Sequence, residues 1–305
     1  MEDIKNLKDY YEKDVFVGIQ KPKIVSQMGL NLYHYTSPDG LMGIVKSKNL
    51  FATRSDCLND TRECEDVYDM YKQALDILER EDVFYQKFRN IEPNKESVFC
   101  WNNGETLKAK KVSNCITYIV SFSSDEDSIS MWNYYVKNNN YEGYNIGIEM
   151  EDFSFHNKKE VYSAQFYEVI YNKWGKIDFF KRLLQDINKY YQNENDYHIA
   201  KAIIQYNLNK YKYIFKNEHF AHEKEIRLVI ELDEKLKPFE IKYKQKDQFV
   251  IPYIEFPIET FGEIIQVTIG PLIKNEKAKQ LIEEFLRNNN LFNVAVISSS
   301  VPVRY

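Results

Sequence analysis

CITYIVSFS (residues 115–123), SISMWNYYV (128–136) and YNIGIEM (144–150) follow one another near the middle of the chain. The first and third runs are rich in β-branched and aromatic residues, which favour strands, whereas the second has the spacing of a short helix. Similar apolar runs return after residue 224 in EIRLVIEL, FEIKY, QFVIPYIEF, EIIQVTIG and NVAVISSS. These runs predict a single α+β domain over residues 1–305 with a β-sheet at its core.

Helical patterns surround the predicted strands. A short amphipathic segment predicts a helical extension over residues 1–28. An apolar stripe from Val67 to Leu78 predicts a helical insertion over residues 61–112, and a second stripe around Phe180 predicts another over 175–222. LNLYHYTS (30–37) and FATR (51–54) predict two further strands, so strand-rich segments frame a helical middle.

The composition restricts the class of protein. The chain has 305 residues and a net charge of -5, with 44% hydrophobic and 29% charged residues, which is typical of a globular protein. No run approaches the ~18 apolar residues of a membrane-spanning helix, and the first residues do not resemble a signal peptide. Four cysteines form no C-x-x-C pair, so we expect reduced thiols and a cytoplasmic location without membrane contact.

Aromatic residues make up 15% of the chain, with 24 Tyr, 19 Phe and 3 Trp. Codon bias of an AT-rich genome explains such an excess, and so does an aromatic pocket; composition does not choose between them.

Several common signatures are absent. The sequence has no G-x-G-x-x-G after a strand, no P-loop and no H-E-x-x-H, which argues against a Rossmann site, a P-loop enzyme and a thermolysin-like zinc site.

The strand around His34 is the first candidate for a site. His34 and Thr36 lie two residues apart and therefore on one strand face, beside Tyr35 on the other. A histidine bonded within the sheet is the alternative interpretation. The run into a turn and a short helix carrying G-L-x-x-I resembles the opening of ADP-ribosyltransferase-fold proteins.

The second candidate is VSFS (120–123) followed by SMWNYY (130–135). Ser121 and Ser123 share one strand face, and Trp132 and Tyr135 are three residues apart on a helix, so an aromatic wall could lie beside two hydroxyls. Such a wall suits a planar ligand, although both aromatic residues could equally be core.

The third candidate is EKEIR (223–227). Period-two alternation predicts that Glu223, Glu225 and Arg227 share one face of a strand. A solvated charged edge is the alternative. The pair of glutamates resembles the E-x-E motif of ADP-ribosyltransferases that modify arginine or nucleic acid.

Together with LNDTRE (58–63), YNIGIE (144–149) and ISSSVPVRY (297–305), these segments resemble the domain-of-unknown-function 2971 family of bacteria over about residues 30–305. Through the order of the three motifs, the chain more remotely resembles the ADP-ribosyltransferase fold. That resemblance implies a split mixed or antiparallel β-sheet core with helical insertions. It also implies that NAD is the substrate.

The second resemblance further implies roles for individual residues. Glu225 would stabilise the charge that develops on the ribose and bind its 2′-hydroxyl, and Glu223 would orient the nucleophile. The remaining residues would bind NAD: Trp132 or Tyr135 by stacking on nicotinamide, His34 and Thr36 around the adenosine side or its ribose, Ser121 and Ser123 through their hydroxyls, and Arg54 or Arg227 at the pyrophosphate. Tyr35, next to His34, is a further candidate for binding NAD.

The expected biological setting is a toxin or phage-defence effector that modifies a macromolecule, either nucleic acid or protein. A phage-encoded or antitoxin protein is an expected partner, and Lys108, Lys110 and Lys111 are candidates for a local basic strip. Two other functions stay open. Asp233 with E-I-K (240–242) could hold Mg²⁺ in a nuclease, and the same pocket could belong to a non-catalytic sensor of a nucleotide or phage protein.

Overall fold

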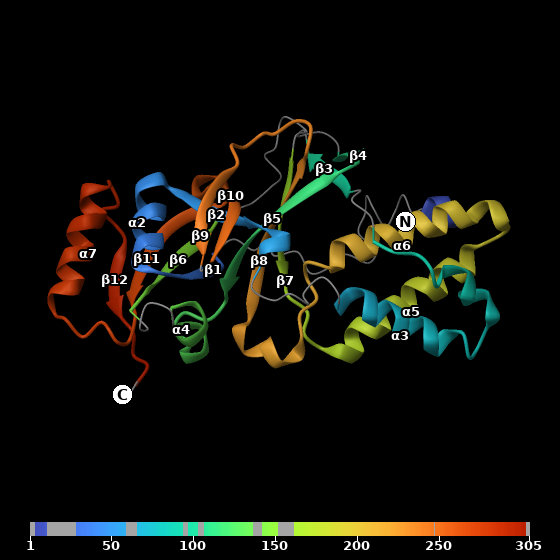
Figure 1. Cartoon of the computed structure of the whole chain (residues 1–305), viewed down its shortest axis with the longest axis horizontal. Helices are drawn as coiled ribbons and strands as arrows, with labels where there is room; N and C mark the ends of the chain where they lie inside the picture. The colour runs from blue at the N-terminus through green and yellow to red at the C-terminus, as the bar shows by residue number, and fades with distance from the viewer. Residues whose placement is uncertain are drawn as a thin grey trace.

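The computed structural model describes residues 4–10, 29–58, 66–93, 97–102, 107–136, 142–151, 162–246 and 248–302. It has a lobe built on a large β-sheet and a lobe of helices beside it (Figure 1). Most of the expected extension over residues 1–28, most of the LNDTRE segment and the last three residues lie outside the described residues.

Within the described residues, the sheet has ten strands of mixed orientation. The β11–β12 pair is parallel and the other pairs are antiparallel. The strand order along the main path is β12 (Ala295–Ser298), β11 (Gly262–Ile269), β6 (Tyr144–Met150), β1 (Asn31–Thr36), β5 (Cys115–Ser123), β2 (Asn49–Arg54), β10 (Phe249–Pro257) and β9 (Lys242–Lys246). Off this path, β8 (Glu225–Asp233) pairs with β5 and with β7 (Tyr162–Glu168).

The sheet opens along one edge of β5. β8 pairs with β5 along its whole length, from Cys115 to Ser123. A strand has only two edges, so β1 and β2 must share the other one. β1 pairs there with Ser123 alone, while β2 pairs with Tyr118 and Ile119. β1 and β2 therefore diverge, and the backbone between their contacts faces the opening.

Alternation along β8 separates the main hydrophobic core from the opposite face of the strand. Ile226, Leu228 and Ile230 are buried in the core of the sheet lobe, which also receives Leu41 and Ile44 from α2 (Pro38–Ser47). The intervening residues of β8 are Glu225, Arg227, Val229 and Glu231, and all are buried on the other side. The strand thus buries both faces, one of them largely with charged groups.

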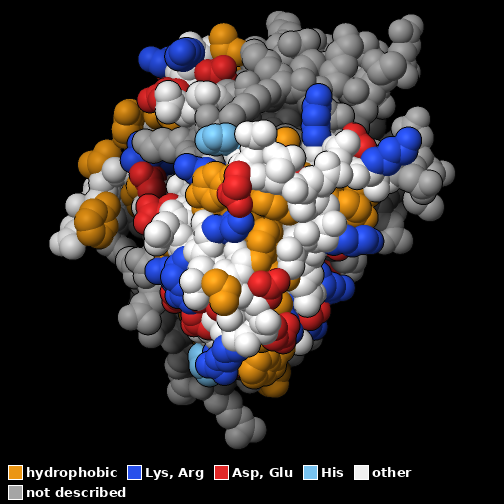
Figure 2. Space-filling view, turned by 90° about the vertical axis from the view of Figure 1, so that its right-hand side faces the viewer, with side chains coloured by type: hydrophobic (Ala, Val, Ile, Leu, Met, Phe, Trp, Pro, Cys, Tyr) orange, Lys and Arg blue, Asp and Glu red, His pale blue; other side chains and the backbone are white. Residues whose placement is uncertain are grey.

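The helical lobe has a hydrophobic core of its own. α3 (Asp66–Leu78), α5 (Lys173–Tyr190) and α6 (Tyr197–Tyr211) bury the stripes expected from the sequence, and Leu7 and Tyr10 join them. Figure 2 shows the end of the molecule that this lobe occupies in Figure 1. There, side chains of opposite charge are interspersed on the described surface rather than gathered by sign.

One expected helical region is different. β3 (Ser97–Asn102) and β4 (Leu107–Val112) are strands that pair antiparallel, so the expectation of a helical insertion over 61–112 is wrong for its last part. The reason lies in the sequence, because SVFCWN is rich in aromatic and β-branched residues that favour strands. Lys108, Lys110 and Lys111 lie on β4. Among the described residues, no helix is long and apolar enough to cross a membrane.

Candidate functional site

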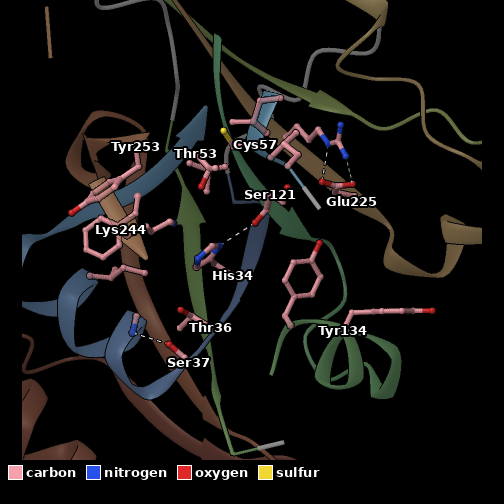
Figure 3. A pocket seen from close by; sticks show the side chains of 18 of the residues that line it. His34, Thr36, Ser37, Thr53, Cys57, Ser121, Tyr134, Glu225, Lys244 and Tyr253 are labelled. Atoms are coloured by element: carbon pink, nitrogen blue, oxygen red, sulfur yellow. Dashed lines mark hydrogen bonds and ion pairs between the residues drawn. The ribbon is translucent and has the colours of Figure 1, made fainter. Parts of the chain in front are cut away.

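A cavity of about 700 Å³ lies where the sheet opens. It is lined from β1, β2, β5 and β8, from the start of α2, from α4 (Ile129–Tyr135) and from the segment between α6 and β8. Seven of the eleven residues expected from the sequence line it together: His34, Thr36, Ser121, Tyr135, Glu223, Glu225 and Arg227. Figure 3 shows Lys244 and Tyr253 on one side of His34 and Glu225 on the other.

His34 bridges the opening of the sheet. Its Nδ1 atom lies 3.0 Å from the carbonyl oxygen of Ser121, in the part of β5 that neither β1 nor β2 pairs (Figure 3). A carbonyl only accepts hydrogen bonds, so Nδ1 carries the proton and Nε2 of the neutral ring is an acceptor. Burial and the charge of Lys244 hold the pKa of His34 below its usual value, against the opposing effect of this bond. His34 is thus both bonded within the sheet and part of the cavity wall.

Two cations hold the carboxylate of Glu225 in the cavity wall. Its carboxylate accepts hydrogen bonds from Arg227, Nε at 2.7 Å and Nη2 at 2.9 Å, and from Lys216 Nζ at 3.1 Å. Only 1% of its side chain is exposed. Burial by itself would raise the pKa of Glu225, but the charges of Arg227 and Lys216 and a hydrogen bond from Ser121 hold it at about 2. Glu225 is therefore ionised at neutral pH.

Glu223 lines the cavity, but it does not lie on the strand expected from the sequence. Lys224 has a left-handed backbone, with φ of 45°, and β8 begins only at Glu225. The expectation that Glu223 shares a strand face with Glu225 and Arg227 is therefore wrong, because Glu223 ends a 3₁₀ segment, η5 (Glu218–Glu223). Lys216 brings the two glutamates together, since its Nζ atom also lies 2.7 Å from Glu223 Oε2.

The two carboxyl groups have opposite pKa shifts. Lys216 Nζ is 2.7 Å from Glu223 Oε2 and 3.1 Å from Glu225 Oε2, so these oxygens are at most 5.8 Å apart. Burial and the neighbouring charge of Glu225 raise the pKa of Glu223, although Lys216 and Arg227 oppose this. A pair of acids with pKa values driven apart is the arrangement that divides the roles of charge stabiliser and proton carrier.

Two of the expected aromatic residues lie outside the cavity wall. Tyr35 and Trp132 pack edge to face, with ring centroids 4.8 Å apart, and both are buried. Trp132 Nε1 donates to Asp127 Oδ1 at 2.8 Å, and Tyr35 donates its hydroxyl to the Asp125 carbonyl at 2.9 Å. This is the core alternative for Trp132, whereas Tyr135 and its neighbour Tyr134 in that motif both line the cavity.

Ser123 and Arg54 also lie outside the wall. The Ser123 hydroxyl is buried and donates to the Glu223 carbonyl at 2.7 Å, so it supports a wall residue from behind. Arg54 is partly exposed and pairs with Asp56 at 2.6 Å. Strand alternation puts Ser121 and Ser123 on one face of β5. It does not predict that Ser121 lines the cavity whereas Ser123 is buried behind the wall.

Sequence reasoning missed Lys216, Lys244, Tyr253 and Cys57, which all line the cavity. No local pattern marks them, because they come from separate elements that meet only in the folded chain. The residues proposed for a nuclease do not meet there. Asp233 accepts a hydrogen bond from the Lys235 backbone, and no group of three His, Cys, Asp or Glu in the described part of the chain is placed to hold a metal ion.

Comparison with known proteins gives a family match over part of the chain. No curated protein and no solved structure matches the chain. Residues 131–228 match the model of a family described as "Protein of unknown function (DUF2971)". The matched stretch runs from α4 to β8 and contains Tyr135, Lys216, Glu223, Glu225 and Arg227, so the two glutamates of the cavity wall and the cations that contact them belong to the part of the chain that resembles this family.

Proposed function

We propose that the protein is an ADP-ribosyltransferase-like enzyme that takes NAD as its substrate. The observation that carries this proposal is the carboxylate pair: Glu225 is held ionised, and Glu223, with a raised pKa, lies within 5.8 Å of it in the cavity where the sheet opens. A negative charge fixed before the reaction suits a transition state in which positive charge develops on a sugar.

The reaction is a substitution at C1′ of the nicotinamide ribose. The C1′–N bond breaks, and nicotinamide leaves as a neutral molecule with the electron pair of that bond. Glu225 stabilises the oxocarbenium-like ribose and accepts a hydrogen bond from its 2′-hydroxyl. Glu223 takes the proton of the incoming nucleophile, because a carboxyl group with a raised pKa is a better base. The products are nicotinamide, the ADP-ribosylated acceptor and a proton.

The rest of the wall would bind the dinucleotide. A volume of about 700 Å³ is within the range of cofactor pockets. His34 offers the Nε2 acceptor described above, Thr36 and Ser121 offer hydroxyls, and Tyr135 offers an aromatic ring in the same cavity wall. Because Trp132 and Tyr35 are buried outside the wall, nicotinamide stacking falls to Tyr135 in this proposal.

The proposed setting is that of a toxin or phage-defence effector with a macromolecular target. One observation favours a second function, a sensor that binds the nucleotide without turnover. Glu225 is 1% exposed and already in contact with two cations, as a purely structural charge cluster would be. The two functions differ in whether bond cleavage follows binding.

Incubation of the purified protein with labelled NAD and separate pools of protein, DNA and RNA distinguishes them. The enzyme releases nicotinamide and labels one pool, whereas the sensor shows only an NAD-dependent rise in melting temperature. If NAD causes no nicotinamide release and no shift in melting temperature, both functions are refuted.

A further inference from the structure

Lys216 is fixed in the cavity wall from several directions. It follows α6, and its backbone N–H donates to the Ile170 carbonyl at 3.2 Å. Its own carbonyl accepts a hydrogen bond from Lys176, a buried residue of α5. The ammonium group therefore reaches the glutamates from a backbone that the helical lobe holds in place.

The charges around Lys216 cancel. The cluster contains two carboxylates, Glu223 and Glu225, and two cations, Lys216 and Arg227, and the side chains of all four are at most 6% exposed. Lys216 bonds both carboxylates, and Arg227 uses Nε and Nη2 on Glu225 and Nη1 on the Tyr213 carbonyl at 2.9 Å. With both glutamates ionised, the buried cluster has no net charge.

Binding of a further cation beside this neutral, buried cluster is unfavourable. A guanidinium acceptor would need the Glu223 carboxylate as its counter-ion, but Lys216 Nζ lies 2.7 Å from that carboxylate. Lys216 and Arg227 already balance the two carboxylates, so a guanidinium would be a third cation and would leave a buried positive charge without a counter-ion. A hydroxyl, a neutral amine or water adds no charge and needs only an acceptor for its proton, which Glu223 supplies.

We infer that Lys216 determines the acceptor class: by occupying the carboxylate pair it restricts the reaction to uncharged nucleophiles and excludes guanidinium groups. The inference rests on the proposed function. In the step, the acceptor oxygen or nitrogen forms the new bond to C1′ as nicotinamide leaves, and the acceptor proton moves to Glu223. No other reactant is needed.

Agmatine, a small guanidinium compound, is the probe. Its binding is measured by calorimetry without NAD, and its ADP-ribosylation is compared with NAD hydrolysis, in which water is the acceptor. We expect the wild-type protein to hydrolyse NAD without modifying agmatine. Lys216→Gln keeps hydrogen-bond donors but removes the charge, so agmatine binding should rise about tenfold or more. Lys216→Arg keeps the charge and should keep the exclusion.

Lys224→Gln is the matched control, because Lys224 is next to Glu225 in sequence but is 60% exposed and pairs with Asp125 at 3.1 Å. It should behave as the wild type does. Wild-type agmatine binding as tight as that of Lys216→Gln would overturn the inference, as would agmatine modification by the wild type that matches hydrolysis. Absence of any nicotinamide release would refute the proposed enzyme instead, and the calorimetric comparison would still decide the role of Lys216.

Discussion

Glu225 accepts two hydrogen bonds from Arg227, at 2.7 Å and 2.9 Å, although the two residues belong to one strand. They lie two positions apart on β8, so their side chains leave the same face and can meet directly. This paired geometry fixes the plane of the carboxylate before any ligand arrives. It also ties stability to the candidate site, because both groups are buried.

Glu225→Gln should lower the free energy of unfolding by about 3 kcal/mol, since it leaves buried cations without their counter-charge. Chemical denaturation measures this loss. Glu231→Gln is the matched control: Glu231 is on the same strand face, 6% exposed, and pairs with Lys210 at 2.6 Å, outside the cavity wall. It should lose a similar amount. A Glu225→Gln protein as stable as the wild type would show that its charge is solvated.

The free energy of unfolding should decrease as the pH is lowered below about 6.5, and part of this decrease should depend on His34. Its pKa in the folded protein is below the ordinary value of 6.5, chiefly because of burial. Below that pH the unfolded chain binds a proton that the folded chain does not, so unfolding is favoured as pH falls toward the folded-state pKa. His34→Gln has no such proton. Denaturation curves from pH 7 to 5 should converge for the two proteins; parallel curves would mean that His34 titrates normally.

The sheet was largely readable from sequence. Residues 115–123 and 144–150 were predicted as strands and are β5 and β6, because dense β-branched and aromatic runs mark both. FEIKY was predicted as a strand over residues 239–243, whereas β9 is Lys242–Lys246. Antiparallel pairing with β10, in which Lys246 is paired with Phe249, sets this register, and the local apolar pattern does not contain that information.

The rate of nicotinamide release should fall as the pH is lowered, because Glu223 must be deprotonated to act as the base. Its pKa is raised, mainly by burial, and Lys216 opposes that rise. Lys216→Gln removes the opposing charge, so the acid limb of nicotinamide release should move to higher pH, while Lys216→Arg should leave it in place. Rates measured from pH 5 to 8 test this. An unmoved limb in Lys216→Gln would remove Glu223 from the role of base.

Substitutions of Tyr135 and Trp132 should distinguish an aromatic residue that binds NAD from one that packs in the core. Tyr135→Ala should weaken NAD binding about tenfold, because Tyr135 lines the cavity, and should change stability little because it is only partly buried. Trp132→Phe should cost about 1–2 kcal/mol through the lost hydrogen bond to Asp127, with unchanged NAD affinity. Calorimetry with NAD and thermal unfolding provide the two readouts. Unchanged NAD affinity in Tyr135→Ala would remove the stacking role from Tyr135.

The candidate site was readable only in part, and the reason is physical. Alternation correctly places His34 and Thr36 on one face, because both are inside one strand. It fails for Glu223, because a left-handed residue at Lys224 interrupts the strand. Lys216 carries no sequence signal at all, since its contacts with the glutamates depend on how the helical lobe meets β8. Part of the aromatic excess is buried in the core, as Tyr35 and Trp132 illustrate.

The most direct test is nicotinamide release from NAD by the wild type, Glu225→Gln and Glu231→Gln, each at a temperature where it is folded. The wild type should release nicotinamide, Glu231→Gln should retain that rate, and Glu225→Gln should lose about 10²–10³-fold, as expected when a fixed transition-state charge is removed. Equal rates for the wild type and Glu225→Gln would contradict the assignment of Glu225 as the charge that drives the reaction.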